Sequence, residues 1–179
     1  MKLPRERCMT TFTGLRFCYY DPQPQSVSLQ DIAHHLSLLC RWGGACSQFY
    51  SVAQHSVLVS HLCPPALARW GLLHDAAEAY FGDLQGGIKL MLPEYKEMEV
   101  RAMQVIAERF GLPWPQPPQL KQFDLLALAL EARDLMHQSE VLYDQHGNIL
   151  KLELPPMVLH AWSPAVAKSR FLVRFGELQ

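Results

Sequence analysis

The sequence has little charge and almost no imbalance of charge. Asp, Glu, Lys and Arg make up only 18% of its 179 residues, and 16 basic against 17 acidic side chains leave a formal net charge of -1. Because a long polyphosphate ligand requires a surplus of basic side chains, this balance argues against a polymeric nucleic acid as partner. The hydrophobic content of 49% argues against a disordered chain and is enough for the core of one domain.

The chain also lacks an uninterrupted apolar segment of membrane-spanning length. Residues 42–68 carry no Asp, Glu, Lys or Arg, but glycines, glutamines, histidines and the pair Pro64-Pro65 interrupt them. A lipid-facing helix tolerates such residues badly. Residues 1–8 contain scattered charges and no apolar stretch, so no secretory signal is expected. We therefore expect a cytoplasmic protein that does not associate with membranes.

The cysteines form an odd-numbered set without CxxC spacing: Cys8, Cys18, Cys40, Cys46 and Cys63. Such a set is typical of free thiols in a reducing compartment. We expect all five to be free.

Helical signals cover most of the chain after residue 25, and no internal repeat or low-complexity tract divides it. Residues 10–20 favour a short strand or extended arm before the Asp-Pro-Gln-Pro turn. Apolar periodicity and cap residues predict helices over 28–43, 52–62, 65–80, 93–110 and 121–136, a short strand over 149–154, and a closing helix from Ser163 whose Val166 and Phe171 dock on the core.

Turn-forming residues separate these helices. The pair Gly43-Gly44 is expected to end the first helix, Gly82 and Gly86-Gly87 to form a loop, and residues 113–118 (PWPQPP) to be a rigid connector. The expected architecture is all-α with minor short β elements near the termini. Its parts are an N-terminal arm, residues 1–25, and a single helical domain, residues 26–179.

Ionisable side chains interrupt three of the apolar segments. His55 lies within the second predicted helix, His74-Asp75 follows an apolar run, and Asp124 precedes another. Any one of them alone is more typical of a hydrogen-bonded core histidine or a helix-start carboxylate. Together they indicate a metal site, because imidazole and carboxylate suit divalent Mn, Fe, Co or Zn. Glu78 could accept a proton from a metal-bound water.

The order of these residues resembles the signature H…HD…D of the HD-domain metal-dependent phosphohydrolases. The segments CRWGG…FYSVAQHSVLVS (40–60), LLHDAAEAYFGDL (72–84) and FDLLALALEARDLM (123–136) are most similar to the YfbR-type bacterial 5′-deoxynucleotidases and the short phage dATP triphosphohydrolases. The resemblance covers residues 28–136. It implies an HD-domain helical bundle, a hydrolase of nucleotide metabolism and a homo-oligomer.

The resemblance also implies roles for single residues. His55, His74, Asp75 and Asp124 match the metal ligands, for a Mn, Co, Fe or Zn ion with Mg as a candidate second ion. Glu78 matches the glutamate that orients or activates the attacking water, and Asp75 belongs with it to the catalytic set.

Further matches concern the substrate. Arg41 would face the phosphate and Trp42 would crowd the ribose 2′ position, where a hydroxyl would lose its water without gaining a partner. Asp83 would hold the sugar 3′-hydroxyl, and Lys89 would help to neutralise phosphate. The chain departs from the family at residues 85–88, where a proline-containing turn is common. Apart from the resemblance, Glu131 lies seven residues after Asp124, two turns on and on the same helix face, and could form a salt bridge with Arg41 or Lys89 inside the site.

The expected reaction is hydrolysis of a deoxynucleotide. The substrate is either a 5′-monophosphate, giving deoxynucleoside and phosphate, or a dNTP, giving deoxynucleoside and triphosphate. The small number of nearby cations (Arg41, Lys89 and Arg16) favours a monophosphate. The alternatives are a non-catalytic nucleotide-sensing module and an HD phosphodiesterase acting on a signalling nucleotide.

Overall fold

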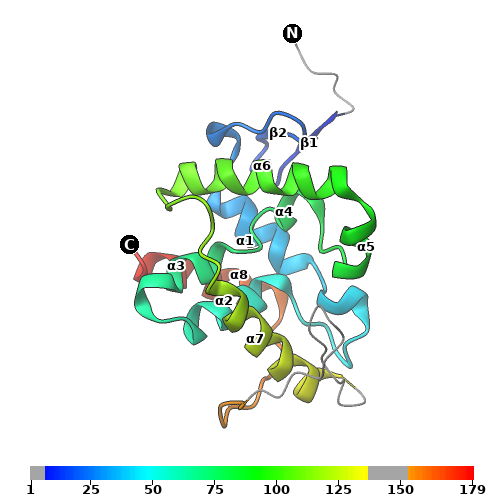
Figure 1. Cartoon of the computed structure of the whole chain (residues 1–179), viewed down its shortest axis with the longest axis vertical. Helices are drawn as coiled ribbons and strands as arrows, with labels where there is room; N and C mark the ends of the chain where they lie inside the picture. The colour runs from blue at the N-terminus through cyan, green and yellow to red at the C-terminus, as the bar shows by residue number, and fades with distance from the viewer. Residues whose placement is uncertain (1–6, 137–152) are drawn as a thin grey trace.

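The computed structural model describes residues 7–136 and 153–179, and these are mostly helical (Figure 1). The elements in chain order are β1 (Cys8–Thr10), β2 (Arg16–Cys18), η2 (Pro24–Ser26), α1 (Leu29–Leu38), η3 (Arg41–Gly44), α2 (Val52–Leu62), α3 (Pro65–Leu73), α4 (Glu78–Phe81), α5 (Gly86–Met91), α6 (Pro93–Phe110), α7 (Leu120–Leu135) and α8 (Pro164–Glu177). The all-α class with a small β element is confirmed. Residues 149–152 of the strand expected near the C-terminus lie outside the described residues, and Glu153 and Leu154 are not in a strand.

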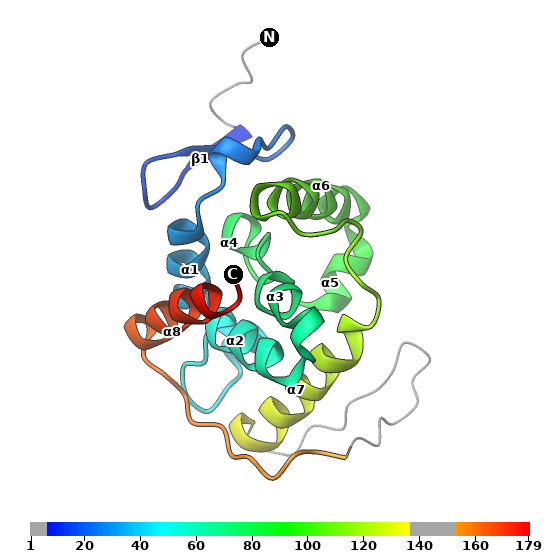
Figure 2. The same cartoon turned by 90° about the vertical axis from the view of Figure 1, so that its left-hand side faces the viewer.

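Helix α2 is the centre of the molecule. Its residues from Val52 to Ser60 are all buried, and it packs against α1, α3, α7 and α8, as Figure 2 shows. A helix that is buried on every side is stable only when other elements enclose it and its polar side chains have partners. It begins where the sequence predicts, because the Ser51 hydroxyl accepts a hydrogen bond from the Gln54 amide. His55 is therefore fully buried, with 0% exposure.

Gly71 allows α3 to lie unusually close to α2. A Cβ atom at this position would meet Cys63 Sγ at 2.9 Å and Ser60 Cα at 3.0 Å. A larger residue would push the two helices apart. The close approach brings His74, which follows α3, next to His55.

The helix expected over 65–80 is interrupted. Helix α3 ends at Leu73, residues 74–77 form turns, and α4 begins at Glu78. The amide of Ala76 donates to Leu73 O and that of Glu78 to Asp75 O, so these bonds span three residues rather than four. Apolar spacing does not reveal the break, because Leu73, Ala77 and Tyr80 are buried on both sides of it.

Two other helix boundaries differ from expectation. Helix α1 ends before Gly43-Gly44, because Leu39 and Cys40 turn extended and pair with the chain just before α2. Gly86-Gly87 begin α5 instead of forming a loop. Lys89 of this helix forms ion pairs with Glu78 and Glu99. These ion pairs stabilise α5 and so offset the low helix propensity of its two glycines.

The N-terminal hairpin corrects the expectation about cysteines. Strands β1 and β2 pair antiparallel with Cys8 opposite Cys18, and the two form a disulfide. Cys40, Cys46 and Cys63 are free thiols. Strand pairing placed the bonded pair together, and their spacing in the sequence does not indicate it. Phe17 in β2 is buried and stacks on Tyr80 of α4, with ring centroids 3.9 Å apart.

Helix α8 closes over α1 and α2. Ser163 caps it as expected, and Phe171 is fully buried, but Val166 is 41% exposed and does not dock as predicted.

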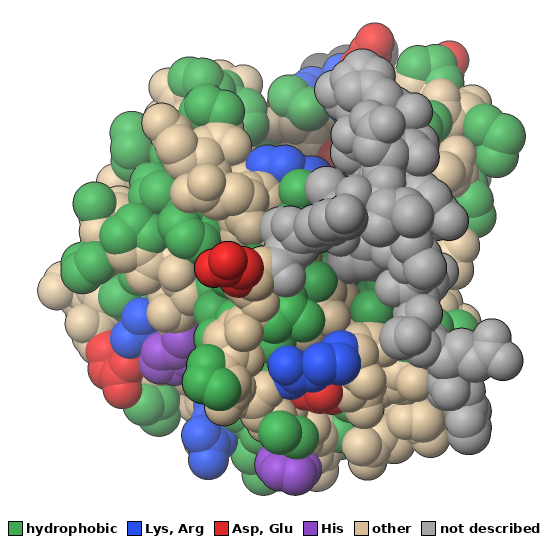
Figure 3. Space-filling model, turned by 60° about the horizontal axis from the view of Figure 1, so that its bottom comes forward, with side chains coloured by type: hydrophobic (Ala, Val, Ile, Leu, Met, Phe, Trp, Pro, Cys, Tyr) green, Lys and Arg blue, Asp and Glu red, His purple; other side chains and the backbone are tan. Residues whose placement is uncertain are grey.

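The surface of the molecule carries charges of both signs, and Figure 3 shows them scattered among hydrophobic side chains on one face. Among the described helices, none is both long and apolar enough to cross a membrane.

Candidate metal centre

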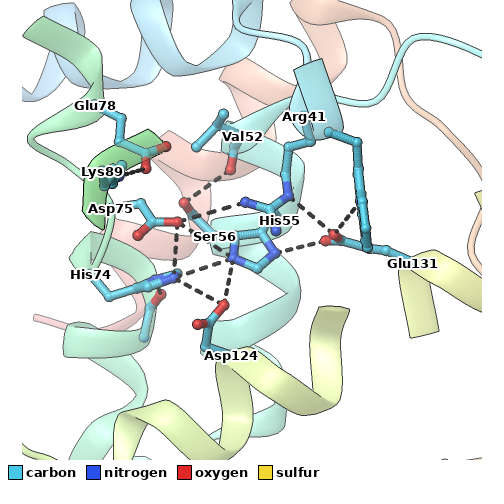
Figure 4. Close-up of polar contacts among 12 residues, drawn as sticks. Arg41, Val52, His55, Ser56, His74, Asp75, Glu78, Lys89, Asp124 and Glu131 are labelled. Carbon is cyan, nitrogen blue, oxygen red and sulfur yellow. Dashed lines mark hydrogen bonds and ion pairs between the residues drawn. The ribbon is translucent and has the colours of Figure 1, made fainter. Parts of the chain in front are cut away.

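Four side chains from three separate segments converge beside α2 (Figure 4). His55 comes from α2, His74 and Asp75 from the turn after α3, and Asp124 from α7. The two Nε2 atoms of the histidines lie 3.2 Å apart. Asp75 Oδ2 lies 3.5 Å from His55 Nε2 and 3.1 Å from His74 Nε2, and Asp124 Oδ1 lies 3.3 Å and 3.9 Å from the same atoms. The structure thus brings all four predicted ligands together.

These distances suit a single ion. Two ligands that bind one ion at about 2.1 Å lie about 3.0 Å apart at a right angle and about 3.4 Å apart in a tetrahedron. Ligand atoms of His55, His74 and Asp124 all lie within 4.8 Å of one another. These three residues could hold a metal ion, and Asp75 Oδ2 lies close enough to both imidazoles to be a further ligand.

The other ring nitrogen of each histidine faces an acceptor. His55 Nδ1 lies 2.7 Å from Glu131 Oε1, and His74 Nδ1 lies 2.8 Å from Gly71 O. Because both oxygens can only accept, each Nδ1 carries a proton, and a neutral ring then presents its lone pair at Nε2. Two facing lone pairs 3.2 Å apart repel, so this point requires a positive charge, either a proton on one of the two Nε2 atoms or a metal ion. A divalent ion fits this donor set.

The surrounding carboxylates favour a cation at this point. Burial lowers the pKa of His74, but the charges of Asp75 and Asp124 outweigh it and raise this pKa to about 9. Burial also disfavours the charged form of Asp75, but His74 holds the pKa of that carboxyl well below its usual range. The hydrogen bond to His55 has the same effect on the pKa of Asp124 against burial.

Glu78 lies beside this cluster at the start of α4. Its Oε1 accepts a hydrogen bond from Lys89 Nζ at 2.9 Å, whereas its buried Oε2 has no hydrogen-bond partner among the described residues. Burial and then the charge of Asp75 raise the pKa of Glu78 well above its usual value, and Lys89 opposes them. A buried oxygen without a donor is costly, so this atom suits a bound water or ligand.

The positive charge of Lys89 is already neutralised by two carboxylates. Its Nζ lies 2.9 Å from Glu78 Oε1 and 2.9 Å from Glu99 Oε1 of α6. Burial lowers the pKa of Lys89, but these two carboxylates raise it further than burial lowers it. A phosphate at Lys89 would have to compete with both. Glu99 carried no signal in the sequence, because an acidic residue on an amphipathic helix is ordinarily solvated.

Arg41 and Trp42 meet at one carboxylate. Arg41 Nε donates to Glu131 Oε2 at 3.1 Å, and Trp42 Nε1 donates to the same oxygen at 3.2 Å. Arg41 Nη1 also lies 3.8 Å from Asp75 Oδ2. Asp83 is partly buried after α4; burial raises its pKa, and the charge of Arg41 opposes this. Of these three substrate-binding candidates, Arg41 and Asp83 therefore lie close enough to Asp75 for their charges to interact with it.

Glu131 is the residue that the sequence anticipated only in part. Its position two turns after Asp124 predicted a partner in Arg41 or Lys89, and Arg41 is the partner. Its bonds to His55 and Trp42 were not expected, because they depend on how α7 packs against α2 and η3.

Two cavities border His74 and Asp75. One of about 310 Å³ is also lined by Lys121, Asp124 and residues 116–118. The other, of about 200 Å³, is lined by Glu78, Lys89, Glu99 and Trp114, among others. The connector at 113–118 thus contributes to the walls of both. The candidate metal ligands therefore border two cavities, and the larger one reaches the size of small-molecule sites.

Comparison with known proteins places the chain in a family. No family model matches it. It is 39% identical to the uncharacterized protein YfdR of Escherichia coli K12 over 168 residues, which cover 94% of this chain and 93% of YfdR. The chain belongs to the YfdR family. It is also 33% identical to an uncharacterized protein of Rhodobacter capsulatus over 175 residues, covering 84% of this chain and 89% of that protein. Both relatives are uncharacterized, so the comparisons assign no activity to this chain.

Proposed function

We propose that the protein is a cytoplasmic, metal-dependent phosphohydrolase of the HD-domain type that acts on deoxynucleotides. The observation that supports this most is the convergence of His55, His74, Asp75 and Asp124, with each imidazole oriented by an acceptor at Nδ1. A Mn, Co, Fe or Zn ion held there would polarise phosphate and lower the pKa of a bound water. The order H…HD…D in the sequence supports the same reaction.

Glu78 is the proposed acceptor of the proton from the attacking water. Its Oε2 atom is available for that water, while Lys89 at Oε1 favours the ionised form against the effect of burial. Arg41 is the proposed counter-charge for the phosphate oxygens as the P–O bond breaks. Its Nε is bound by Glu131, which directs the rest of the guanidinium toward Asp75.

A 5′-monophosphate is the favoured substrate. Carboxylates compensate both predicted phosphate-binding cations: Glu131 and Asp75 contact Arg41, and Glu78 and Glu99 contact Lys89. A triphosphate would bring more negative charge than this arrangement can balance. Trp42 and Asp83 are the proposed contacts to the 2′ and 3′ positions of the sugar, and the resemblance supports a homo-oligomer.

The test is phosphate release by the purified protein from panels of dNMPs and dNTPs, with and without Mn²⁺, Co²⁺ or Mg²⁺. We expect divalent-dependent release of phosphate from dNMPs and its loss in Asp124→Ala. Nucleotide binding without turnover of any compound would favour the sensing module. Activity confined to cyclic or tetraphosphate signalling nucleotides, without preference for deoxy sugars, would favour the phosphodiesterase.

A further inference from the structure

One fully buried carboxylate contacts two parts of the site. Glu131 has 0% exposure. Its Oε1 atom accepts a hydrogen bond from His55 Nδ1, and its Oε2 atom accepts one from Arg41 Nε (Figure 4). The same Oε2 atom also accepts a hydrogen bond from Trp42 Nε1. A metal-ligand candidate and both members of the Arg-Trp pair are therefore bound to the same side chain.

The geometry points to Glu131 as a positioning residue that couples metal binding to recognition of the sugar. This inference rests on the proposed function for the identity of the sugar-binding residues. Its physical basis is that a change in the position of this carboxylate moves His55 on one side and Trp42 on the other.

Only glutamate satisfies all three donors from this position. A carboxylate has two oxygens that only accept, so it can face the N–H groups of His55, Arg41 and Trp42 together. Glutamine has one accepting oxygen, and its NH₂ group would confront an N–H on one of the two sides. Aspartate keeps the charge but is one methylene shorter, so it cannot reach both sides from the same backbone.

The backbone conformation of Trp42 makes its hydrogen bond to Glu131 important. Trp42 has φ +58°, the one positive φ of a residue other than glycine in the part of the chain that the structure describes. Such a conformation is strained for a residue with a side chain and persists only when surrounding contacts hold it. The bond from Trp42 Nε1 to Glu131 is such a contact.

Helix α7 explains how the coupling can be transmitted. It carries both Asp124 and Glu131, seven residues apart on one face, and its contact with α2 places Glu131 against His55. One rigid element therefore supplies a candidate ligand and the support of another ligand.

The experiment compares Glu131→Gln, Trp42→Ala and Glu177→Gln with the wild type. Glu177 is a matched control, because its carboxylate pairs with Arg174 on α8, far from these contacts in the chain. Mn²⁺ affinity is measured by calorimetric titration, and sugar preference is the ratio of dissociation constants for dNMP and NMP with the same base. Glu131→Gln is expected to weaken Mn²⁺ binding about 10–100-fold and also to lower the sugar preference. Trp42→Ala should lower the preference alone, and Glu177→Gln should change neither.

A folded Glu131→Gln protein with wild-type Mn²⁺ affinity would overturn the inference, as would weakened metal binding with an unchanged sugar preference. If circular dichroism shows that Glu131→Gln does not fold, Glu131→Asp takes its place, with both effects expected and wild-type values again overturning the inference. These readouts need no turnover. Absence of hydrolysis with every substrate would therefore count against the proposed function, while the coupling would still be decided by binding.

Discussion

Among single residues, His55, His74 and Glu78 share one arrangement. Each has two polar side-chain atoms, of which one is hydrogen-bonded to another part of the protein and the other is left for a metal ion, a water or a substrate. His55 and His74 use Nδ1 for Glu131 and for Gly71 O, and their Nε2 atoms face each other. Glu78 uses Oε1 for Lys89, and its Oε2 atom has no partner in residues 7–136 and 153–179. The fixed atom sets the orientation of the side chain, so the other atom is prepared for a ligand.

Removing the Glu78 carboxylate should separate metal binding from turnover. In Glu78→Ala, the four metal-ligand candidates keep their contacts, so Mn²⁺ affinity should be nearly unchanged. Turnover should fall by about 10²–10⁴-fold, because the proton acceptor is lost. Calorimetric titration and phosphate release measure the two effects. Wild-type turnover in this variant would assign water activation to another group.

Protons should compete with the metal at His74. The pKa of about 9 for this residue means that its imidazole is protonated near neutral pH when no metal is bound. Displacing that proton makes the apparent Mn²⁺ affinity rise about tenfold per pH unit and level off above about pH 9. Without metal, the same shift stabilises the fold fully below the unfolded pKa of 6.5, and this stability is lost as the pH rises through about 9. Titrations from pH 6 to 9 measure the slope, and an affinity that does not change with pH would contradict the assignment.

At the scale of elements, helix ends and breaks place the functional groups. His74 follows the last residue of α3, Asp75 lies in the turn, and Glu78 begins α4. His55 is unlike these three residues, because it lies in the middle of α2. It belongs to a buried site because neighbouring helices enclose α2. The close approach of α2 and α3 at Gly71 therefore decides whether the two imidazoles can meet.

Gly71→Ala should weaken both the fold and the metal site. Its Cβ would clash with Cys63 Sγ and with the backbone at Ser60, and such overpacking costs about 1–3 kcal/mol, partly offset by the better helix propensity of alanine. Gly176→Ala in α8 is the matched control, since nothing lies within 4 Å of its added Cβ. That change should raise the free energy of unfolding by up to about 1 kcal/mol. Urea denaturation and Mn²⁺ titration measure the effects, and equal behaviour of the two variants would show that the close approach is unimportant.

At the scale of the whole molecule, the metal site would connect segments that are far apart in the chain. Its candidate ligands belong to α2, to the turn between α3 and α4, and to α7. An ion bound there stabilises the folded state alone, because the unfolded chain does not hold these ligands together.

Metal should therefore raise the unfolding temperature. At a free Mn²⁺ concentration 100 times the dissociation constant, the stabilisation is about 2.7 kcal/mol, and EDTA should remove it. Thermal denaturation followed by circular dichroism measures the shift. His55→Ala should abolish it, because the variant lacks a central ligand. A shift of the same size in that variant would mean that Mn²⁺ binds elsewhere.

The helical class, several helix caps and the residues of the candidate site could be predicted from local sequence patterns. Ser51 and Ser163 cap the helices they were predicted to begin, because a cap needs only a hydroxyl three residues before an amide. The apolar surroundings of His55 and Asp124 drew attention to them, since buried charge requires a partner, but only the joint order of His55, His74-Asp75 and Asp124 indicated a metal site.

The contacts among these residues could not be predicted in this way, because they depend on how the helices pack. Three donors from α2 and η3 meet Glu131 of α7, and Lys89 lies between Glu78 and Glu99, through contacts between residues up to 90 positions apart. The break after Leu73 and the pairing of Cys8 with Cys18 also depend on packing and strand register. Local patterns record the propensity and burial of each residue, whereas distances between distant segments are set by how closely the helices pack.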